Sequence, residues 1–166
     1  MKLRIVAISD THEQHNKIIV PDGDVLVHAG DITWKGDLEP LYNFDRWLGH
    51  LPHEHKLVVA GNHDWAFQLI PDTARKIITN AIYLRDSAIK LAGLLFYGSP
   101  WQPRYQNWAF NLERGKELAE KWALIPDKTD VLITHGPPFG HCDKLRPKRG
   151  GIRVGCEDLL RRVKAI

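Results

Sequence analysis

The sequence predicts an α/β fold, arranged as a sandwich of two mixed sheets flanked by helices. Short apolar, β-branched runs alternate with a helical pattern, which favours parallel strands that are buried on both faces. A tight turn at Ala92-Gly93 between two further apolar runs predicts a β-hairpin, and with it a second, more antiparallel sheet. No linker, repeat or low-complexity tract interrupts the chain, so we expect one domain over residues 1-166.

Each element follows from a local pattern. The apolar runs predict core strands at residues 3–9, 24–29, 56–60 and 130–134, and hairpin strands at residues 88–91 and 94–97. Between residues 37 and 51, apolar residues recur at steps of three and four, the spacing of an amphipathic helix. Similar patterns predict helices over residues 112–124 and 154–166.

No strand follows the apolar stripe of the last predicted helix. We therefore expect the final strands of the fold to be missing from this chain, and the stripe to be covered by its own sheet or by a second copy in a homo-oligomer.

Composition limits the classes of function. With 166 residues, 43% hydrophobic content and a net charge of +3, the chain predicts a globular domain that tolerates an anionic substrate. A concentrated basic face is absent from the pattern, so we do not expect nucleic-acid binding. No apolar segment approaches the roughly 20 residues of a membrane span, so no membrane association is expected. The two cysteines, Cys142 and Cys156, predict no disulfide framework and a cytoplasmic location.

Residue types that ligate metals follow the ends of the four predicted core strands. They occur in the motifs Asp10-Thr11-His12, Gly30-Asp31, Gly61-Asn62-His63-Asp64 and His135-Gly136. The carboxyl ends of parallel strands meet at one edge of a sheet, so these side chains are expected to converge. One carboxylate can bridge two metal ions that lie about 3.5–4 Å apart. Asp-x-His or Gly-Asp alone is more often a turn or a cap, whereas Gly-Asn-His-Asp is an unusual turn sequence and a sharper signal. All of the motifs together, in this order, predict a binuclear metal site.

The motifs resemble those of the calcineurin-like metallophosphoesterase superfamily, closest to the small branch of brain metallophosphoesterase-domain proteins. The resemblance rests on residues 9–12, 28–31, 60–64, 97–101, 108–110 and 135–138. It implies two divalent ions of the Mn, Fe, Ni or Zn type. Asp10, His12 and Asp31 would hold the first ion, and Asp31, Asn62 and His135 the second.

The resemblance also implies a reaction. A hydroxide that bridges the two ions would attack the phosphorus of a small phosphodiester or nucleotide-like phosphate. His63 would be the catalytic residue, as general acid or charge stabiliser at the leaving oxygen. Asn62 and His63 would also contact the substrate.

Two departures from the family pattern affect this expectation. Trp34 stands where many relatives have an aspartate that pairs with the catalytic histidine, which leaves adjacent Asp64 as a candidate partner of His63. The last family motif, Gly-His-x-His, has no counterpart in the sequence, which predicts a sparse metal shell and reduced activity. His141 is a candidate replacement ligand, although a surface histidine is the more common interpretation.

Other features leave alternatives open. The basic residues Lys144, Arg146, Lys148 and Arg149 either gather an anionic substrate or form a solvated loop. The aromatic residues Trp101, Tyr105, Trp108 and Phe110 either stack on a nucleotide base or pack beneath a loop. The rival to an enzyme is a degenerate, catalytically weak family member that binds a nucleotide or a protein. A nuclease is a third, less favoured interpretation.

Overall fold

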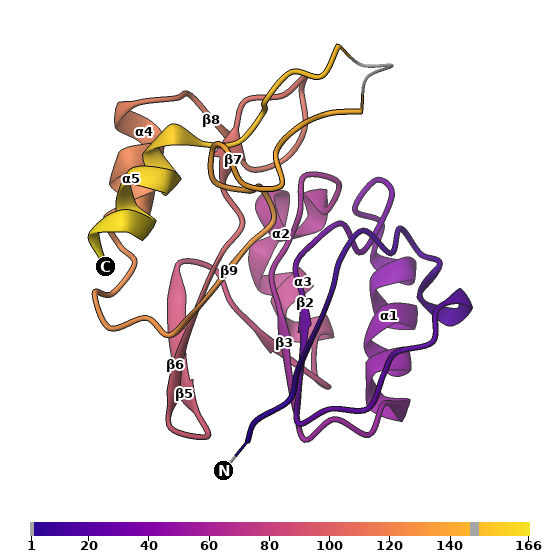
Figure 1. Cartoon of the computed structure of the whole chain (residues 1–166). Coiled ribbons are helices and arrows are strands. Elements are labelled where there is room, and N and C mark those ends of the chain that lie inside the picture. Colours follow the sequence, from indigo (N-terminus) through magenta and orange to yellow (C-terminus); the bar gives the residue numbers. More distant parts are fainter. Residues whose placement is uncertain (1, 147–149) are drawn as a thin grey trace.

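Two sheets face each other at the centre of the computed structural model, which describes residues 2–146 and 150–166 (Figure 1). The first sheet has the order β1-β2-β3-β4 and is parallel throughout. Its strands are β1 (Ile5–Ile8), β2 (Val25–His28), β3 (His55–Val58) and β4 (Ile82–Tyr83). The strands β1, β2 and β3 match the apolar runs that predicted them. The sequence pattern did not indicate β4.

The second sheet is mixed and has the order β5-β6-β9. The predicted hairpin is present as β5 (Ser87–Leu91) antiparallel to β6 (Leu94–Ser99), and β6 pairs in parallel with β9 (Val131–Thr134). The strand at residues 131–134 thus lies in the second sheet and not beside the three parallel strands before it. A third, two-stranded sheet joins β7 (Gln102–Pro103) to β8 (Asn111–Leu112).

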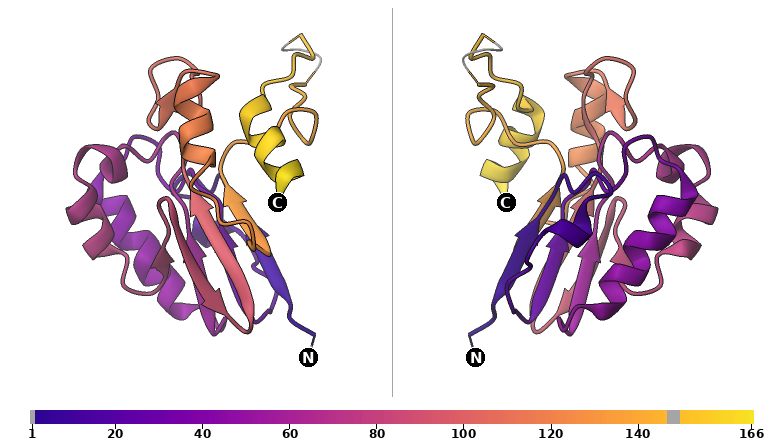
Figure 2. Two further views of the ribbon diagram at one scale, coloured as in Figure 1. Left: turned by 90° about the vertical axis from the view of Figure 1, so that its left-hand side faces the viewer. Right: turned by 90° about the vertical axis from the view of Figure 1, so that its right-hand side faces the viewer.

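Helices cover the outer face of the first sheet and one end of the second (Figure 2). The first group is α1 (Leu38–His50), α2 (Trp65–Leu69) and α3 (Pro71–Ile77). The second group is α4 (Lys116–Trp122) and α5 (Glu157–Ala165), which pack against each other. A short 3-10 helix, η1 (His15–Lys17), lies in the loop after β1. The α/β sandwich that the sequence predicts is therefore confirmed.

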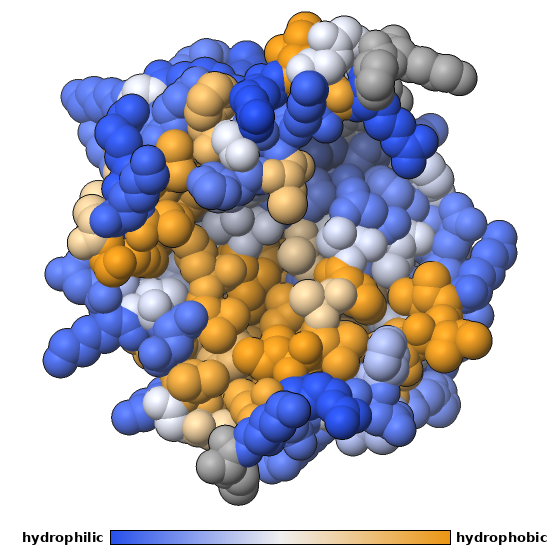
Figure 3. Space-filling model, in the orientation of Figure 1, coloured by the Kyte–Doolittle hydropathy of each residue, from blue (hydrophilic) through white to orange (hydrophobic). Residues whose placement is uncertain are grey.

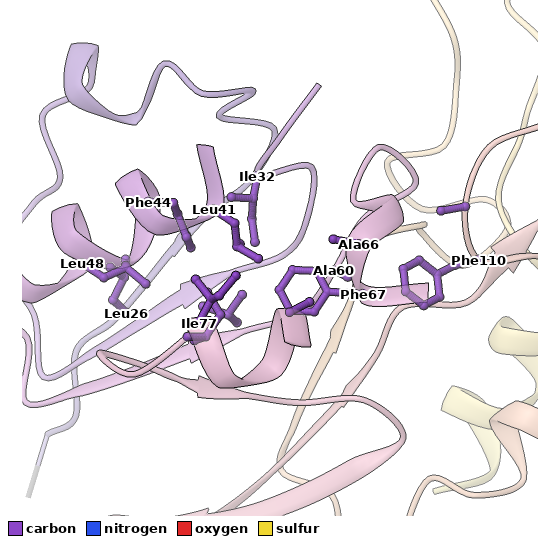
Figure 4. Close-up of a cluster of buried hydrophobic side chains, with 14 residues drawn as sticks. Leu26, Ile32, Leu41, Phe44, Leu48, Ala60, Ala66, Phe67, Ile77 and Phe110 are labelled. Atoms are coloured by element: carbon purple, nitrogen blue, oxygen red, sulfur yellow. The ribbon is translucent and has the colours of Figure 1, made fainter. Parts of the chain in front are cut away.

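The alternation of side chains along β2 explains how the layers hold together. Leu26 packs with Leu41, Phe44 and Leu48 of α1, as Figure 4 shows, whereas Val25 and Val27 point into the layer between the two sheets. All of these side chains are at most 4% exposed. Burial of apolar area stabilises a fold by about 25 cal/mol per Å². Because β2 is apolar on both faces, it stabilises the contact with α1 on one face and the contact with the second sheet on the other.

The apolar stripe of α5 is covered in part by the chain itself. Leu159 is 1% exposed and lies in a cluster with Leu118 and Trp122 of α4, whereas Val163 remains 38% exposed. On the side shown in Figure 3, apolar residues gather over the middle of the face, where β9 and the edge strand β1 lie. Ile5 of β1 is 37% exposed.

Among the described residues, no helix has both the length and the apolar character that crossing a membrane requires.

Candidate metal centre

The carboxyl ends of the strands in both sheets bring the predicted site residues together. Asp10 follows β1, Asp31 follows β2, Asn62 and His63 follow β3, and His135 follows β9. Because the two sheets face each other, the end of β9 reaches the same edge as the ends of β1 to β3. The structure thus brings together all six predicted side chains, the sixth being His12.

The backbone around these ligands is unusual. Asp10, His12 and Asp31 adopt positive φ angles of 55°, 41° and 56°. Residues other than glycine seldom occupy this left-handed region, and such conformations concentrate at functional sites. Three of the predicted site residues therefore have a strained backbone conformation.

Two glycines allow the loops after β2 and β3 to meet. A Cβ atom on Gly61 would lie 2.3 Å from the backbone nitrogen and from Oδ1 of Asp31. A Cβ atom on Gly30 would lie 2.8 Å from Nδ1 of His135, and Gly30 has a φ of +102°. Only residues without side chains fit at this distance, so the glycines determine how closely the ligands approach.

Asp31 is the centre of the site, and its two carboxylate oxygens face opposite groups. Oδ1 lies 3.5 Å from Nε2 of His135, whereas Oδ2 lies 3.6 Å from Nε2 of His12 and 3.9 Å from Nε2 of His63. The backbone N–H of His63 also donates to Oδ1 over 2.9 Å. Asp31 is 3% exposed, so its charge acts through little solvent.

Three histidines each face Asp31 with their Nε2 atom. Nδ1 of His12, of His63 and of His135 lies within 3.1 Å of the backbone carbonyl oxygens of Thr33, Trp34 and Ala29, respectively. Each Nδ1–H therefore donates to a carbonyl, and each Nε2 is left to face Asp31. Such outer hydrogen bonds fix the tautomer and orientation of metal-ligating histidines.

The pKa values reflect the closeness of these groups. Burial by itself lowers the pKa of His135, but the hydrogen bond and charge of Asp31 outweigh it and raise that pKa to about 9. Burial raises the pKa of Asp31, yet His135 and the backbone N–H of His63 hold it below its ordinary value. Asp31 thus favours its ionised form, and its negative charge stabilises positive charge on a neighbouring group.

The carboxylates and imidazoles form two groups that share Asp31. Asp10, Asp31 and His135 form one group, and His12, Asp31 and His63 form the other, with the ligand atoms of each group within 4.8 Å of one another. Oδ1 of Asn62 lies 3.1 Å from Nε2 of His135 and so joins the first group. The resemblance paired Asp10 with His12, whereas the structure places Asp10 with His135.

The donor set fits divalent transition metals. Carboxylate oxygen, amide oxygen and imidazole nitrogen converge from strand ends that hold them in place, and mixed ligands of this kind suit Mn, Fe, Ni or Zn. In a chance cluster of polar side chains, the histidines would not all be held by backbone carbonyls with Nε2 facing the same carboxylate. Here all three are held in this way.

The partner of His63 is the backbone carbonyl of Trp34, at 2.8 Å, and not Asp64. The Trp34 ring stacks on His12 at 4.2 Å, and the Trp108 ring lies 3.9 Å from the ring of His63. Sequence patterns carry no signal for a backbone carbonyl partner, since any residue can supply one.

Asp64 has a structural role instead. Its carboxylate is 1% exposed and accepts hydrogen bonds from the backbone N–H groups of Ile32, Thr33 and Gly61 and from the Thr33 hydroxyl. Asp64 therefore ties the loop after β2 to the loop after β3, which is where Asp31 and His63 lie.

The remaining candidates lie outside the centre. His141 is exposed and belongs to neither ligand group. Lys144 and Arg146 are exposed, while Lys148 and Arg149 lie outside the described residues. Phe110 is buried and Trp101 packs on it, which supports the packing interpretation of these two aromatics.

A family model for calcineurin-like phosphoesterases matches residues 3–163. The chain belongs to the calcineurin-like phosphoesterase family. Phosphoesterases of this family bind divalent metal ions. The two groups that share Asp31 are candidate metal-binding residues in this chain.

Similarity to individual proteins agrees with this assignment. Metallophosphoesterase domain-containing protein 1 of Homo sapiens is 44% identical over 184 residues, which cover 97% of this chain and 56% of that protein. The protein of the same name from Mus musculus matches equally well. A UPF0046 protein of Caenorhabditis elegans is 42% identical over 178 residues, which cover 99% of this chain and 60% of that protein. The chain thus spans little more than half the length of these curated relatives, and the branch that its motifs resemble is confirmed.

A cavity of about 450 Å³ adjoins the metal-binding residues of this phosphoesterase domain. Asp10, Asn62 and His135 form its inner wall, and Tyr105 and Arg104 are among the residues of its outer wall. Tyr105 is 52% exposed there. Two arginines, Arg104 and Arg114, line the same cavity as Asp10, Asn62 and His135.

Proposed function

We propose that this chain is a metal-dependent phosphoesterase that hydrolyses small phosphodiesters or nucleotide-like phosphates. One observation carries the proposal: a buried carboxylate, Asp31, presents Oδ1 to His135 and Oδ2 to His12 at 3.5 and 3.6 Å. A carboxylate placed between two sets of oriented imidazoles is what a site for two ions needs.

The residues for each ion follow from the two groups. Asp10, Asp31 and His135, with the amide oxygen of Asn62, would hold one ion. His12 and Asp31 would hold the other. When bound, such ions act as Lewis acids toward phosphoryl oxygens and make water acidic enough to attack near neutral pH.

His63 is proposed to be the general acid. Its Nδ1–H is held by the Trp34 carbonyl, so a proton on Nε2 can pass to the oxygen of the departing alcohol as the phosphorus–oxygen bond breaks. Solvent then returns a proton to Nε2. Asn62, which lines the cavity beside the centre, would contact the phosphoryl group.

A sparse ligand set motivates the second candidate. The proposed ions have few protein ligands among the described residues, and losing ligands of even the outer shell costs about 10–100-fold in affinity or activity. A weakly active domain that binds a nucleotide or a protein partner is therefore the alternative, and reduced metal affinity is expected in either case.

Hydrolysis of bis-p-nitrophenyl phosphate, titrated with Mn²⁺, tests the proposal. We expect metal-dependent turnover in the native chain and its loss in Asn62→Ala. His141→Ala is the matched control, because it removes an exposed histidine outside the ligand groups. Background rates at saturating Mn²⁺, with Mn²⁺ binding shown by calorimetry, would favour the binding module. Absence of Mn²⁺ binding would overturn the metal-dependent phosphoesterase.

A further inference from the structure

A second cavity lies on the other side of the candidate metal centre. It measures about 500 Å³ and shares Asp10 with the first cavity, but it extends past His12 toward Trp34 and the segment after η1. Lys17, Ile18 and Ile19 complete its far wall. The centre therefore lies between two cavities of different character.

Large apolar side chains are exposed in this second cavity. Trp34 is 47% exposed, Ile18 39% and Ile19 96%. We name these three residues the apolar shelf. Figure 3 shows an apolar patch at the right of the face, over the part of the chain that makes η1 in Figure 1. Apolar side chains gathered beside a polar centre are more typical of a ligand surface than of scattered exposure.

Trp34 connects the shelf to His63. Its carbonyl holds Nδ1 of His63 at 2.8 Å, its ring stacks on His12 at 4.2 Å, and the Trp34 and His63 ring centroids are 6.0 Å apart. The first cavity, in contrast, adjoins Asn62 and His135. The ligand atoms of His63 and His12 lie within 4.8 Å of each other, and His12 lines the second cavity, whereas His63 does not. A general acid must lie next to the oxygen that departs, so the departing alcohol fits on the side of the centre where His12 lies.

We propose that the apolar shelf is the binding subsite for the departing alcohol, and that the preferred substrates are phosphoesters of an apolar, flat alcohol such as a fused-ring phenol. This inference rests on the proposed phosphoesterase function. The phosphorus–oxygen bond to that alcohol breaks, water supplies the new oxygen on phosphorus, and the alcohol receives its proton from His63.

Binding without turnover tests the shelf separately from catalysis. Two phosphonates, 2-naphthylmethylphosphonate and benzylphosphonate, have a carbon–phosphorus bond that hydrolysis does not cleave. Calorimetry with the Mn²⁺-loaded chain should show that the naphthyl compound binds about tenfold more tightly, since extra apolar area in a pocket gives discrimination of that order. Equal affinities would overturn the proposal.

Variants locate the effect. Ile19→Ser and Ile18→Ser should each reduce the naphthyl-to-benzyl affinity ratio about two- to fivefold, because each removes apolar contact area. Leu69→Ser is the matched control, since Leu69 is 69% exposed and does not line the cavity. An unchanged ratio in both isoleucine variants, or an equal loss in the control, would contradict a subsite at the shelf.

Turnover provides the second readout. The 2-naphthyl and phenyl esters of methyl phosphate have leaving groups of similar acidity, so their kcat/KM ratio reports mainly on binding. A ratio near one would overturn the inference while leaving the phosphoesterase proposal intact. Phosphonate discrimination without any ester hydrolysis would instead contradict the phosphoesterase function and support the shelf as a ligand site only.

Discussion

At the scale of single residues, the histidines of the centre are defined by what their Nδ1 atoms contact. Each of the three donates to a backbone carbonyl, so each Nε2 points at Asp31. The residue types and their order predicted this set. The tautomers depend on carbonyls of Thr33, Trp34 and Ala29, whose positions are set by the fold.

Replacement of His63 should depend on the leaving group. In His63→Ala, we expect kcat to fall about 100-fold or more for phenyl esters, in the range that general acids contribute. The fall should be small for p-nitrophenyl esters, because that alcohol leaves without a proton. The slope of log kcat against leaving-group pKa, compared between the native chain and the variant, measures this. Equal losses for both esters would rule out acid catalysis by His63.

Replacement of Asp64 should affect folding before chemistry. In Asp64→Asn, the new side-chain amide would turn its N–H₂ group toward backbone N–H groups that now donate to the carboxylate. The free energy of unfolding should therefore fall by about 1–3 kcal/mol. Urea denaturation measures the change. Asp37→Asn is the control, because Asp37 is exposed and its side chain makes no cap hydrogen bond. If Asp64→Asn lowered the free energy of unfolding no more than Asp37→Asn does, the structural role of Asp64 between the two loops would be refuted.

At the scale of elements, the site depends on how closely the loops after β2 and β3 approach. The strands themselves followed from apolar runs, as did α1 from its periodic spacing. The helices α2 and α3 were not predicted, because five and seven residues are too few to show a period. The predicted helix over residues 112–124 begins only at Lys116, since residues 111–112 pair with β7.

Gly61→Ala tests the close approach. The new Cβ atom would overlap the backbone of Asp31, so the loops must separate, at a cost of about 1–3 kcal/mol for overpacking. Mn²⁺ affinity by calorimetry should fall together with the thermal midpoint. In Gly93→Ala, where no atom lies within 4 Å of the new Cβ, Mn²⁺ affinity should be unchanged. Native Mn²⁺ affinity in Gly61→Ala would show that the approach is not needed.

At the scale of the whole molecule, stability should depend on pH through His28. This imidazole is 0% exposed; its Nδ1 accepts from the backbone N–H of Gly30, and its Nε2–H donates to Thr11 Oγ1. Burial, followed by the charge of His135, lowers the pKa of His28 from 6.5 to about 3. Between these values the unfolded chain binds a proton that the folded chain does not, so folding weakens as pH falls through this window.

Urea midpoints measured from pH 7.5 down to about 4 should therefore fall steeply for the native chain. In His28→Asn the fall should be shallower, although the variant is less stable at neutral pH because it loses buried hydrogen bonds. His50→Asn is the control, since His50 is exposed. Parallel curves for the native chain and His28→Asn would show that another group controls acid stability.

The sequence alone determined the alternation of strands and helices, the single hairpin and the residue types of the centre, because these follow from local periodicity and from motifs a few residues long. Only the tertiary structure decided that β9 lies in the second sheet, that Asp10 joins His135, and that a carbonyl of Trp34 orients His63. These are contacts between segments 29 to 125 residues apart, made by backbone atoms and close approaches that carry no signature in residue identity.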